Sequence, residues 1–145
     1  MEDTTQYVTL TLADQEYGVA ISLVNEIIRV AKPTRVPLAA PWMLGVINLR
    51  GHLIPVIDLR IRMGMSTVEA TSQTRVVVVQ INDRRVGLQV DSVAEVVRVS
   101  ASDVRQSPEI MAGTEGVLGV ALLNERLVTI LDASVFVGIK EEAAA

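Results

Sequence analysis

Hydrophobic and polar residues alternate in short runs along the chain, and the runs come in pairs. Residues 8–12 alternate valine and leucine with threonine, a period of two that predicts a half-buried strand. A polar segment leads from there into a second run, 17–21, so the two runs together predict a β-hairpin. The same arrangement returns at 76–81 and 85–90, which flank an Asn-Asp turn.

Another hairpin is predicted by residues 43–49 and 52–57, which are joined by Arg50 and Gly51. A glycine at this point can supply the positive φ that a tight turn between antiparallel strands needs. Short strands with frequent turn signals favour barrels over a parallel sheet.

The chain also repeats itself. Residues 12–30 align without a gap on 81–99, and the two segments end in nearly the same pentapeptide, Glu-Ile-Ile-Arg-Val and Glu-Val-Val-Arg-Val. Each pentapeptide predicts a further strand. After a loop five residues longer in the second copy, residues 45–58 align on 119–132. Such a repeat predicts two copies of one β-rich module.

Each copy ends with an aspartate that is followed six residues later by a glycine. Asp58 and Asp132 are placed to cap short helices, and Gly64 and Gly138 are placed to end them. The polar stretch 66–74 then predicts the connection between the two copies.

Composition agrees with a β-rich protein. Half of the 145 residues are hydrophobic, and aromatic residues are only 3% of the chain, so valine, leucine and isoleucine supply most of the core. The net charge of −4 provides no basic excess, which argues against nucleic acid and against binding to acidic membrane surfaces.

The sequence favours a soluble, cytoplasmic protein. It holds no cysteine, which fits a reducing compartment, and its first five residues are acidic and polar rather than a secretory signal. The longest charge-free apolar run, 36–49, is too short to span a membrane and contains proline and glycine, so we expect no membrane insertion.

Little in the sequence indicates a catalytic, cofactor-binding or metal-binding site. His52 is the only histidine, and without cysteine a zinc site would need three further carboxylate ligands. Asp58 and Asp132 occupy equivalent places in the repeat, so capping explains them better than a pair of catalytic acids. There is no nucleophile elbow and no glycine-rich phosphate loop. We expect no enzyme activity, no cofactor and no metal.

Differences between the copies indicate where function lies. Arg50 and Gly51 are replaced in the second copy, and segment 32–42, with three prolines and the only tryptophan, has no counterpart there. Prolines and a tryptophan suit a preorganised contact surface. The alternative interpretation, given equal weight, is that Trp42 plugs the end of a barrel.

Two segments carry a family resemblance. Residues 45–51, Gly-Val-Ile-Asn-Leu-Arg-Gly, and 54–60, Ile-Pro-Val-Ile-Asp-Leu-Arg, closely resemble the most recognisable stretch of the CheW-like coupling proteins of bacterial chemotaxis. Three further segments fit in the right order: 17–18, 24–27 and 86–93.

The resemblance implies an all-β fold of two SH3-like five-stranded β-barrels that share a hydrophobic core, with short helices. We expect a single CheW-like domain at 6–137, with a first barrel module at approximately 13–65 and a second at 75–137. Two placements stay open for the N-terminal strand, 6–12, which can pack with the first or with the second module, and 138–145 form a tail.

The resemblance also implies a scaffold that joins the histidine kinase CheA, through the kinase's own CheW-like regulatory domain, to the cytoplasmic tips of methyl-accepting chemoreceptors. The protein would be cytoplasmic and recruited to membrane-associated receptor arrays. Glu26 and Arg50 match a coupled pair near the receptor-binding surface of the family. The receptor-binding residues carried over are Val24, Glu26, Ile27, Arg50 and Gly51; the kinase-binding candidates are Lys32, Arg35, Pro41 and Trp42.

Three other functions stay open at this stage. A coupler of pilus-driven motility, of another chemosensory pathway or within a receiver-bearing protein would share these motifs. A small-ligand-binding β-barrel would need an enclosed, aromatic-lined site. An enzyme would need His52 as its base.

Overall fold

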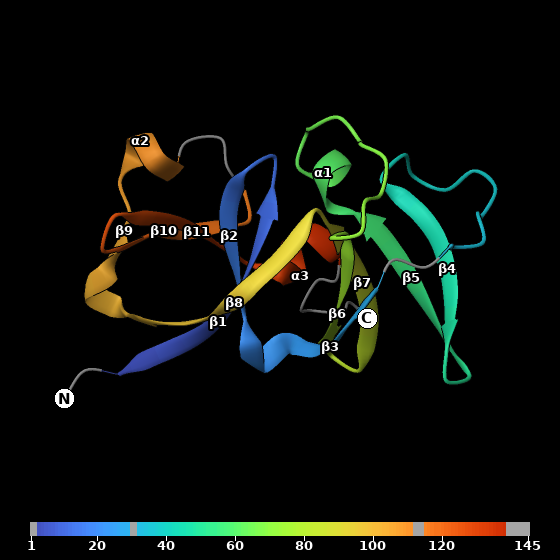
Figure 1. Ribbon diagram of the computed structural model, residues 1–145, viewed down its shortest axis with the longest axis horizontal. Coiled ribbons are helices and arrows are strands. Elements are labelled where there is room, and N and C mark those ends of the chain that lie inside the picture. The colour runs from blue at the N-terminus through green and yellow to red at the C-terminus, as the bar shows by residue number, and fades with distance from the viewer. Residues whose placement is uncertain (1–2, 30–31, 112–114, 139–145) are drawn as a thin grey trace, which may run out of the picture.

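A computed structural model describes residues 3–29, 32–111 and 115–138, which fold into short strands joined by tight turns. Two curved sheets lie side by side, with the helices at their ends and between them (Figure 1). The strands are β1 (Thr4–Leu12), β2 (Gln15–Ala20), β3 (Val24–Arg29), β4 (Met43–Leu49), β5 (His52–Asp58), β6 (Arg75–Ile81), β7 (Arg84–Val90), β8 (Ser92–Ser100), β9 (Val104–Arg105), β10 (Val117–Leu123) and β11 (Arg126–Leu131).

The helices are each about one turn long. They are η1 (Ile21–Leu23), α1 (Leu59–Arg62), η2 (Ala101–Asp103), α2 (Pro108–Met111) and α3 (Ala133–Val137). In the described part of the chain, none is long and apolar enough to cross a membrane.

The two sheets are the SH3-like barrels that the sequence predicts. The first barrel has the strand order β3-β6-β7-β5-β4, and the second has the order β8-β1-β2-β11-β10-β9. The second therefore has six strands rather than five, because the two-residue strand β9 pairs with the outer edge of β10. The final residue of the predicted strand 26–30 and the tail beyond Gly138 lie outside the described residues.

The sheets exchange their N-terminal hairpins. Hairpin β1–β2 begins the first copy but lies between β8 and β11 of the second, and β6–β7 begins the second copy but lies between β3 and β5 of the first. The sheets therefore do not coincide with the ranges 13–65 and 75–137. The N-terminal strand, 6–12, belongs to β1 and to the second barrel.

A glycine lies in each of the parallel strand pairings that the exchanged hairpins make. Gly87 lies opposite Val56 where β7 and β5 pair in parallel, and Gly18 lies opposite Ile130 where β2 and β11 pair in parallel. A Cβ on Gly87 would lie 2.6 Å from Val76 Cγ1. A Cβ on Gly18 would lie 3.2 Å from Ile130 Cδ1. Both glycines thus permit close packing around the strand that receives the exchanged hairpin.

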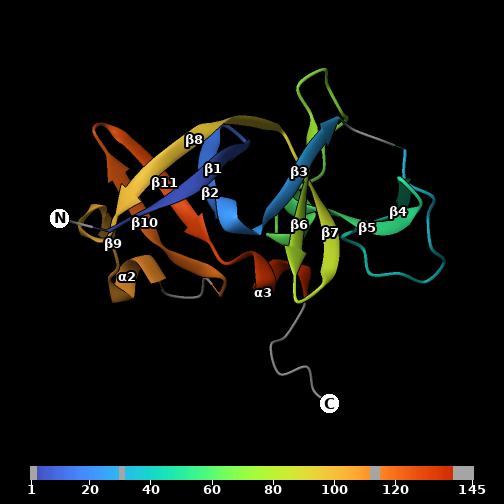
Figure 2. The ribbon, with the colours of Figure 1, turned by 90° about the horizontal axis from the view of Figure 1, so that it is seen from below.

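The hydrophobic core has one shared part and two separate ones. The separate clusters fill the barrels, with Ile54 and Val56 in the first and Val128 and Ile130 in the second. The shared cluster joins both sheets and includes α3, which lies at their junction in both views (Figures 1 and 2). Its buried members are Leu10, Leu12, Tyr17, Val19, Ile57, Leu59, Val77, Val79, Ile81, Val86, Leu88, Val90, Leu131, Ala133, Phe136 and Val137.

The predicted helix caps are confirmed. The Asp58 carboxylate accepts hydrogen bonds from the Arg60 amide at 3.0 Å and from the Thr67 hydroxyl at 2.7 Å. Asp132 accepts from the amide of Ser134 at 3.1 Å. Gly138 ends α3 in the left-handed conformation, with φ of 75°. Each aspartate therefore begins a short helix at the end of its barrel.

We predict that Gly87→Ala destabilises the protein by about 1–3 kcal/mol, because the new methyl group overlaps Val76 in a packed interior. Gly18→Ala should cost less, since its nearest neighbours are side-chain atoms 3.2–3.3 Å away that can shift slightly. Urea unfolding of both variants measures the difference. Equal losses, or a larger loss for Gly18→Ala, would contradict the packing argument.

Candidate functional site

An ion pair joins the two residues that the resemblance couples. Glu26 projects from β3 and Arg50 from the turn between β4 and β5. The contact is two-pronged, with Arg50 Nη1 2.6 Å from Glu26 Oε1 and Arg50 Nη2 3.0 Å from Glu26 Oε2. The arginine side chain is 71% exposed and the glutamate 21% exposed. The pair is therefore accessible to a partner and has a fixed geometry.

The turn places the arginine. Arg50 and Gly51 have φ of 53° and 84°, and the Gly51 amide donates to Asn48 Oδ1 at 2.9 Å. Two successive positive φ values match the twist of a two-residue hairpin. Because β3 and β4 are the edge strands of the first barrel, the ion pair links one edge to the hairpin that forms the other.

Electrostatics keep the pair ionised. The hydrogen bonds from Arg50 lower the pKa of Glu26 below its ordinary value, and the more distant charge of Arg85 acts in the same direction. Glu26 in turn raises the pKa of Arg50. The surface consequently presents a paired carboxylate and guanidinium at neutral pH.

Two exposed apolar side chains lie on strands of the same sheet as the pair. Ile27, on β3, is 40% exposed and Leu53, on β5, is 75% exposed. Val24 is half-buried and packs against the shared core. Leu53 is not among the residues that the sequence pattern singles out, although its cross-strand partner is the polar Asn48, a pairing that signals an outward-facing position.

Two open hollows adjoin at this end of the first barrel and share Gln80 and Asp83. One, of about 260 Å³, is lined by His52, Leu53, Ile54, Gln80, Asp83 and Arg85. The other, of about 340 Å³, is lined by Ser22, Leu23, Val24, Asn25, Gln80, Asn82 and Asp83. Polar groups line both, and His52 is exposed at the rim rather than set in an enclosed site.

The predicted kinase-binding residues of segment 32–42 differ in their exposure to solvent. Lys32, Arg35 and Pro41 are exposed, whereas Trp42 is half-buried against the shared core. The Arg62 guanidinium lies 5.1 Å from the centre of the Trp42 ring, a cation–π contact. The structure thus brings Trp42 into the packing of the fold and leaves Lys32, Arg35 and Pro41 facing solvent.

The later part of this segment, 35–42, and the ion pair lie toward opposite ends of β4, whereas Thr34 pairs with Val46 in the middle of the strand. The segment leads into Met43, the turn at Arg50 follows Leu49, and Figure 1 shows the two regions at opposite ends of the first barrel. Seven residues of extended strand span roughly 20 Å. Two partners could therefore occupy the two ends without excluding each other.

The second barrel has an ion cluster at the equivalent place. Glu95 aligns with Glu26, and Arg126, aligned with His52, reaches it with Nη1 2.6 Å from Glu95 Oε2. Arg126 Nη2 also lies 2.5 Å from Glu16 Oε1. Both barrels thus pair the repeated glutamate with an arginine, but only the first does so from the tip of a turn.

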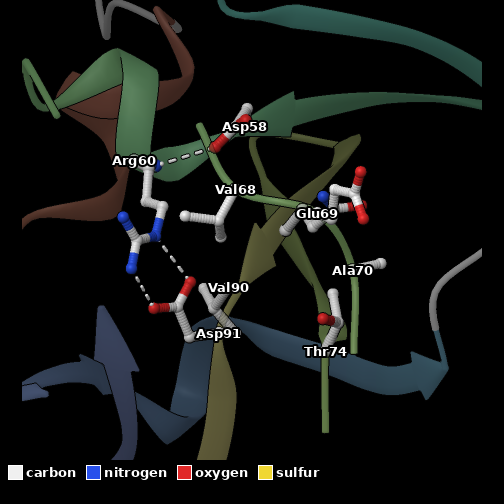
Figure 3. Close-up of a pocket in the computed structure, with 9 residues that line it drawn as sticks. Asp58, Arg60, Val68, Glu69, Ala70, Thr74, Val90 and Asp91 are labelled. Atoms are coloured by element: carbon white, nitrogen blue, oxygen red, sulfur yellow. Dashed lines mark hydrogen bonds and ion pairs between the residues drawn. The ribbon is translucent and has the colours of Figure 1, made fainter. Parts of the chain in front are cut away.

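Polar side chains near Asp58 connect α1, the residue that follows β7 and the turn between β1 and β2. Arg60 binds Asp91 through two hydrogen bonds of 2.8 and 2.6 Å (Figure 3). Asp91 also accepts a hydrogen bond from the Ala13 amide at 2.9 Å. The enclosed space beside them is about 10 Å³, room for about one water molecule. Across the described residues, no three histidine or acidic side chains are grouped to hold a metal ion.

Fold and surfaces together define a two-barrel β protein whose distinctive charged and apolar side chains face outward. The chain belongs to the CheW-like domain family, whose model matches residues 6–140.

Individual relatives agree over most of the chain. It is 34% identical over 131 residues to the chemotaxis protein CheW of Helicobacter pylori, covering 90% of this chain and 79% of that protein. The identity to CheW of Bacillus subtilis is 37% over 122 residues, covering 83% and 78%. The crystal structure of the scaffolding protein TtCheW from Thermoanaerobacter tengcongensis superposes with a TM-score of 0.81 at 31% identity, covering 90% and 89% of the two chains.

We predict that Arg50→Gln raises the pKa of Glu26 toward its ordinary value, because its main hydrogen-bond donor is lost. Arg85→Gln, the matched control, should raise the same pKa less. NMR titration of the Glu26 side-chain carboxyl measures both effects. An unchanged pKa in Arg50→Gln would show that the pair does not form in solution.

The sign of the pH effect follows from the lowered pKa. A carboxylate with a folded-state pKa below its unfolded value adds stability above the unfolded pKa, and this stability is lost as pH falls through the folded pKa. Arg50→Gln should therefore weaken the dependence of stability on pH in the acidic range.

Proposed function

We propose that this protein is a chemotaxis scaffold that couples the histidine kinase CheA to the cytoplasmic tips of methyl-accepting chemoreceptors. The observation that carries the proposal is the exposed, two-pronged Glu26–Arg50 pair on a chain of the CheW-like family. The chain works in the cytoplasm and catalyses no step itself. Its contribution is to hold the kinase and the receptors in a fixed relative position.

The ion pair is better suited to recognition than to stability. Exposed pairs contribute little to folding because solvent screens them. With Ile27 and Leu53 exposed on strands of the same sheet, a fixed carboxylate and guanidinium instead orient a segment that brings both apolar and charged groups. A helix from the receptor tip, with apolar residues at helical spacing, fits this description. Val24 and Gly51 complete the receptor-binding surface.

The opposite end of the first barrel is assigned to the kinase. Lys32, Arg35 and Pro41 are the exposed candidates there, and Trp42 supports them from the packed base of the segment. Since the two ends are separated by the length of β4, receptor and kinase can be held at the same time.

Weak individual contacts are sufficient in an array. Interfaces of about 1,600 Å² in total give widely varying affinities, and linked sites gain effective concentration without any new contact. A small scaffold that binds each partner modestly can therefore control kinase activity when many copies act together.

We predict that Arg50→Glu greatly weakens receptor binding, because it sets two carboxylates against each other and removes the guanidinium from the surface. Kinase binding at the other end should persist. Sedimentation with receptor fragments measures the receptor contact, isothermal titration against CheA without receptor measures the kinase contact, and kinase activity in the receptor pellet reports coupling.

Arg98→Glu is the matched control, since Arg98 is an exposed strand arginine in the second barrel at the position equivalent to Arg29. It should leave sedimentation unchanged. If Arg50→Glu retained wild-type receptor binding, the assignment of this surface would be wrong. If the unmodified chain brought no kinase to the receptor pellet, the proposed function itself would fail.

A further inference from the structure

Leu38 is the most exposed large hydrophobic side chain in the described residues. Its relative exposure is 104%, so it contacts essentially nothing in its own chain. It lies near the middle of segment 32–42, which leads into β4 at the end of the strand away from Arg50. Burial therefore gives the fold no benefit from this leucine.

The backbone at Leu38 also disfavours a leucine. Its φ is +63°, and the Ala39 amide donates to the Val36 carbonyl at 3.3 Å, which closes a turn with Pro37 and Leu38 at its centre. Proline followed by a positive φ describes a type II turn, whose third position normally holds glycine or asparagine. A larger side chain there carries a conformational cost.

Backbone hydrogen bonds fix the chain on both sides of this turn. Thr34 and Val46 exchange two backbone hydrogen bonds of 2.9 Å, and Gly45 provides the space for Thr34 to lie against β4. On the other side, the Asp58 amide donates to the Trp42 carbonyl at 2.8 Å. The leucine is consequently presented by a preorganised loop, which reduces the entropy lost when a partner binds it.

The surroundings of Leu38 indicate the chemistry of that partner. Val36 is a second exposed aliphatic residue in the same turn. Lys32 and Arg35 are exposed, and neither makes an ion pair with any other residue that the structure describes. The turn is thus apolar, and Arg35, which precedes it directly in the chain, adds an unpaired positive charge; this combination is complementary to an apolar pocket edged by carboxylates.

We propose that Leu38 is the anchor of the kinase-facing surface and inserts into an apolar, acid-rimmed pocket on the regulatory domain of the kinase. This assignment rests on the proposed function, since it takes the kinase to be the partner at this end of the barrel. A side chain that the fold neither buries nor favours conformationally is explained by a contact outside the chain. Leu38 is in that case a hot-spot residue, and Lys32 and Arg35 orient the approach.

Two variants test the anchor. Leu38→Gly and Leu38→Asn both accept a positive φ, so each should have a denaturant midpoint equal to or above that of the unmodified protein. Each should lower affinity for full-length CheA about tenfold or more, as hot-spot truncations do, while receptor sedimentation stays unchanged. Isothermal titration against the kinase measures the loss.

Ala39→Gly is the matched control, because it loosens the same turn but keeps the leucine. It should lose much less affinity than Leu38→Gly. Arg35→Glu should weaken kinase binding further at low salt than at high salt, because the contribution of the positive rim is screened.

Each outcome bears on the proposal. Wild-type kinase affinity in both Leu38 variants, or a lowered denaturant midpoint, would overturn it, the second by showing that the leucine serves the fold. A loss of receptor binding or of self-association instead of kinase binding would assign Leu38 to a different partner and also overturn it. If the unmodified chain bound no kinase at all, the failure would lie with the proposed function.

Discussion

The parallel pairing of each exchanged hairpin with a strand of the other copy is the constraint on which the rest of the structure depends. β7 packs along β5 and β2 along β11, and glycine at the point of contact allows the neighbouring side chains to close over each pairing. Strands of both copies thereby face one shared hydrophobic cluster. Each pairing lies within one sheet, so what holds the two barrels together is this shared cluster, which would be exposed if they separated.

This constraint also positions the exposed features. β5 is fixed by its pairing with β7, so hairpin β4–β5 is held against the shared core. Arg50 extends from one end of that hairpin, and the turn containing Leu38 precedes the other. Contact groups at both ends are therefore carried by one rigid element, which suits a protein that keeps two partners in a defined relation.

Sequence patterns predicted the elements better than their partners. Alternation gave β1, β2 and the β4–β5 hairpin, and the repeated aspartates gave the helix starts, because these are local properties of the chain. The exchange could not be predicted, since the four valines 76–79 are buried on both faces and carry no sign of which strands flank them. β9 has only two residues, too few for any period.

The candidate site was likewise only partly predictable from the sequence. Twenty-four residues separate Glu26 from Arg50, so no local rule joins them, and only the family resemblance did so. Leu53 and Leu38 were missed because a hydrophobic residue in a hydrophobic run is normally taken as buried. For Leu38, a residue after proline where a turn prefers glycine was a usable signal in the sequence itself.

The exchanged hairpins have a further consequence for how the protein assembles. One copy alone would lack a hairpin between its third and fifth strands, and a second molecule would have to supply it, as in a domain-swapped dimer. Such an assembly would depend on protein concentration. With both copies in one chain, joined through residues 66–74, the same association is intramolecular and proceeds equally well at high dilution.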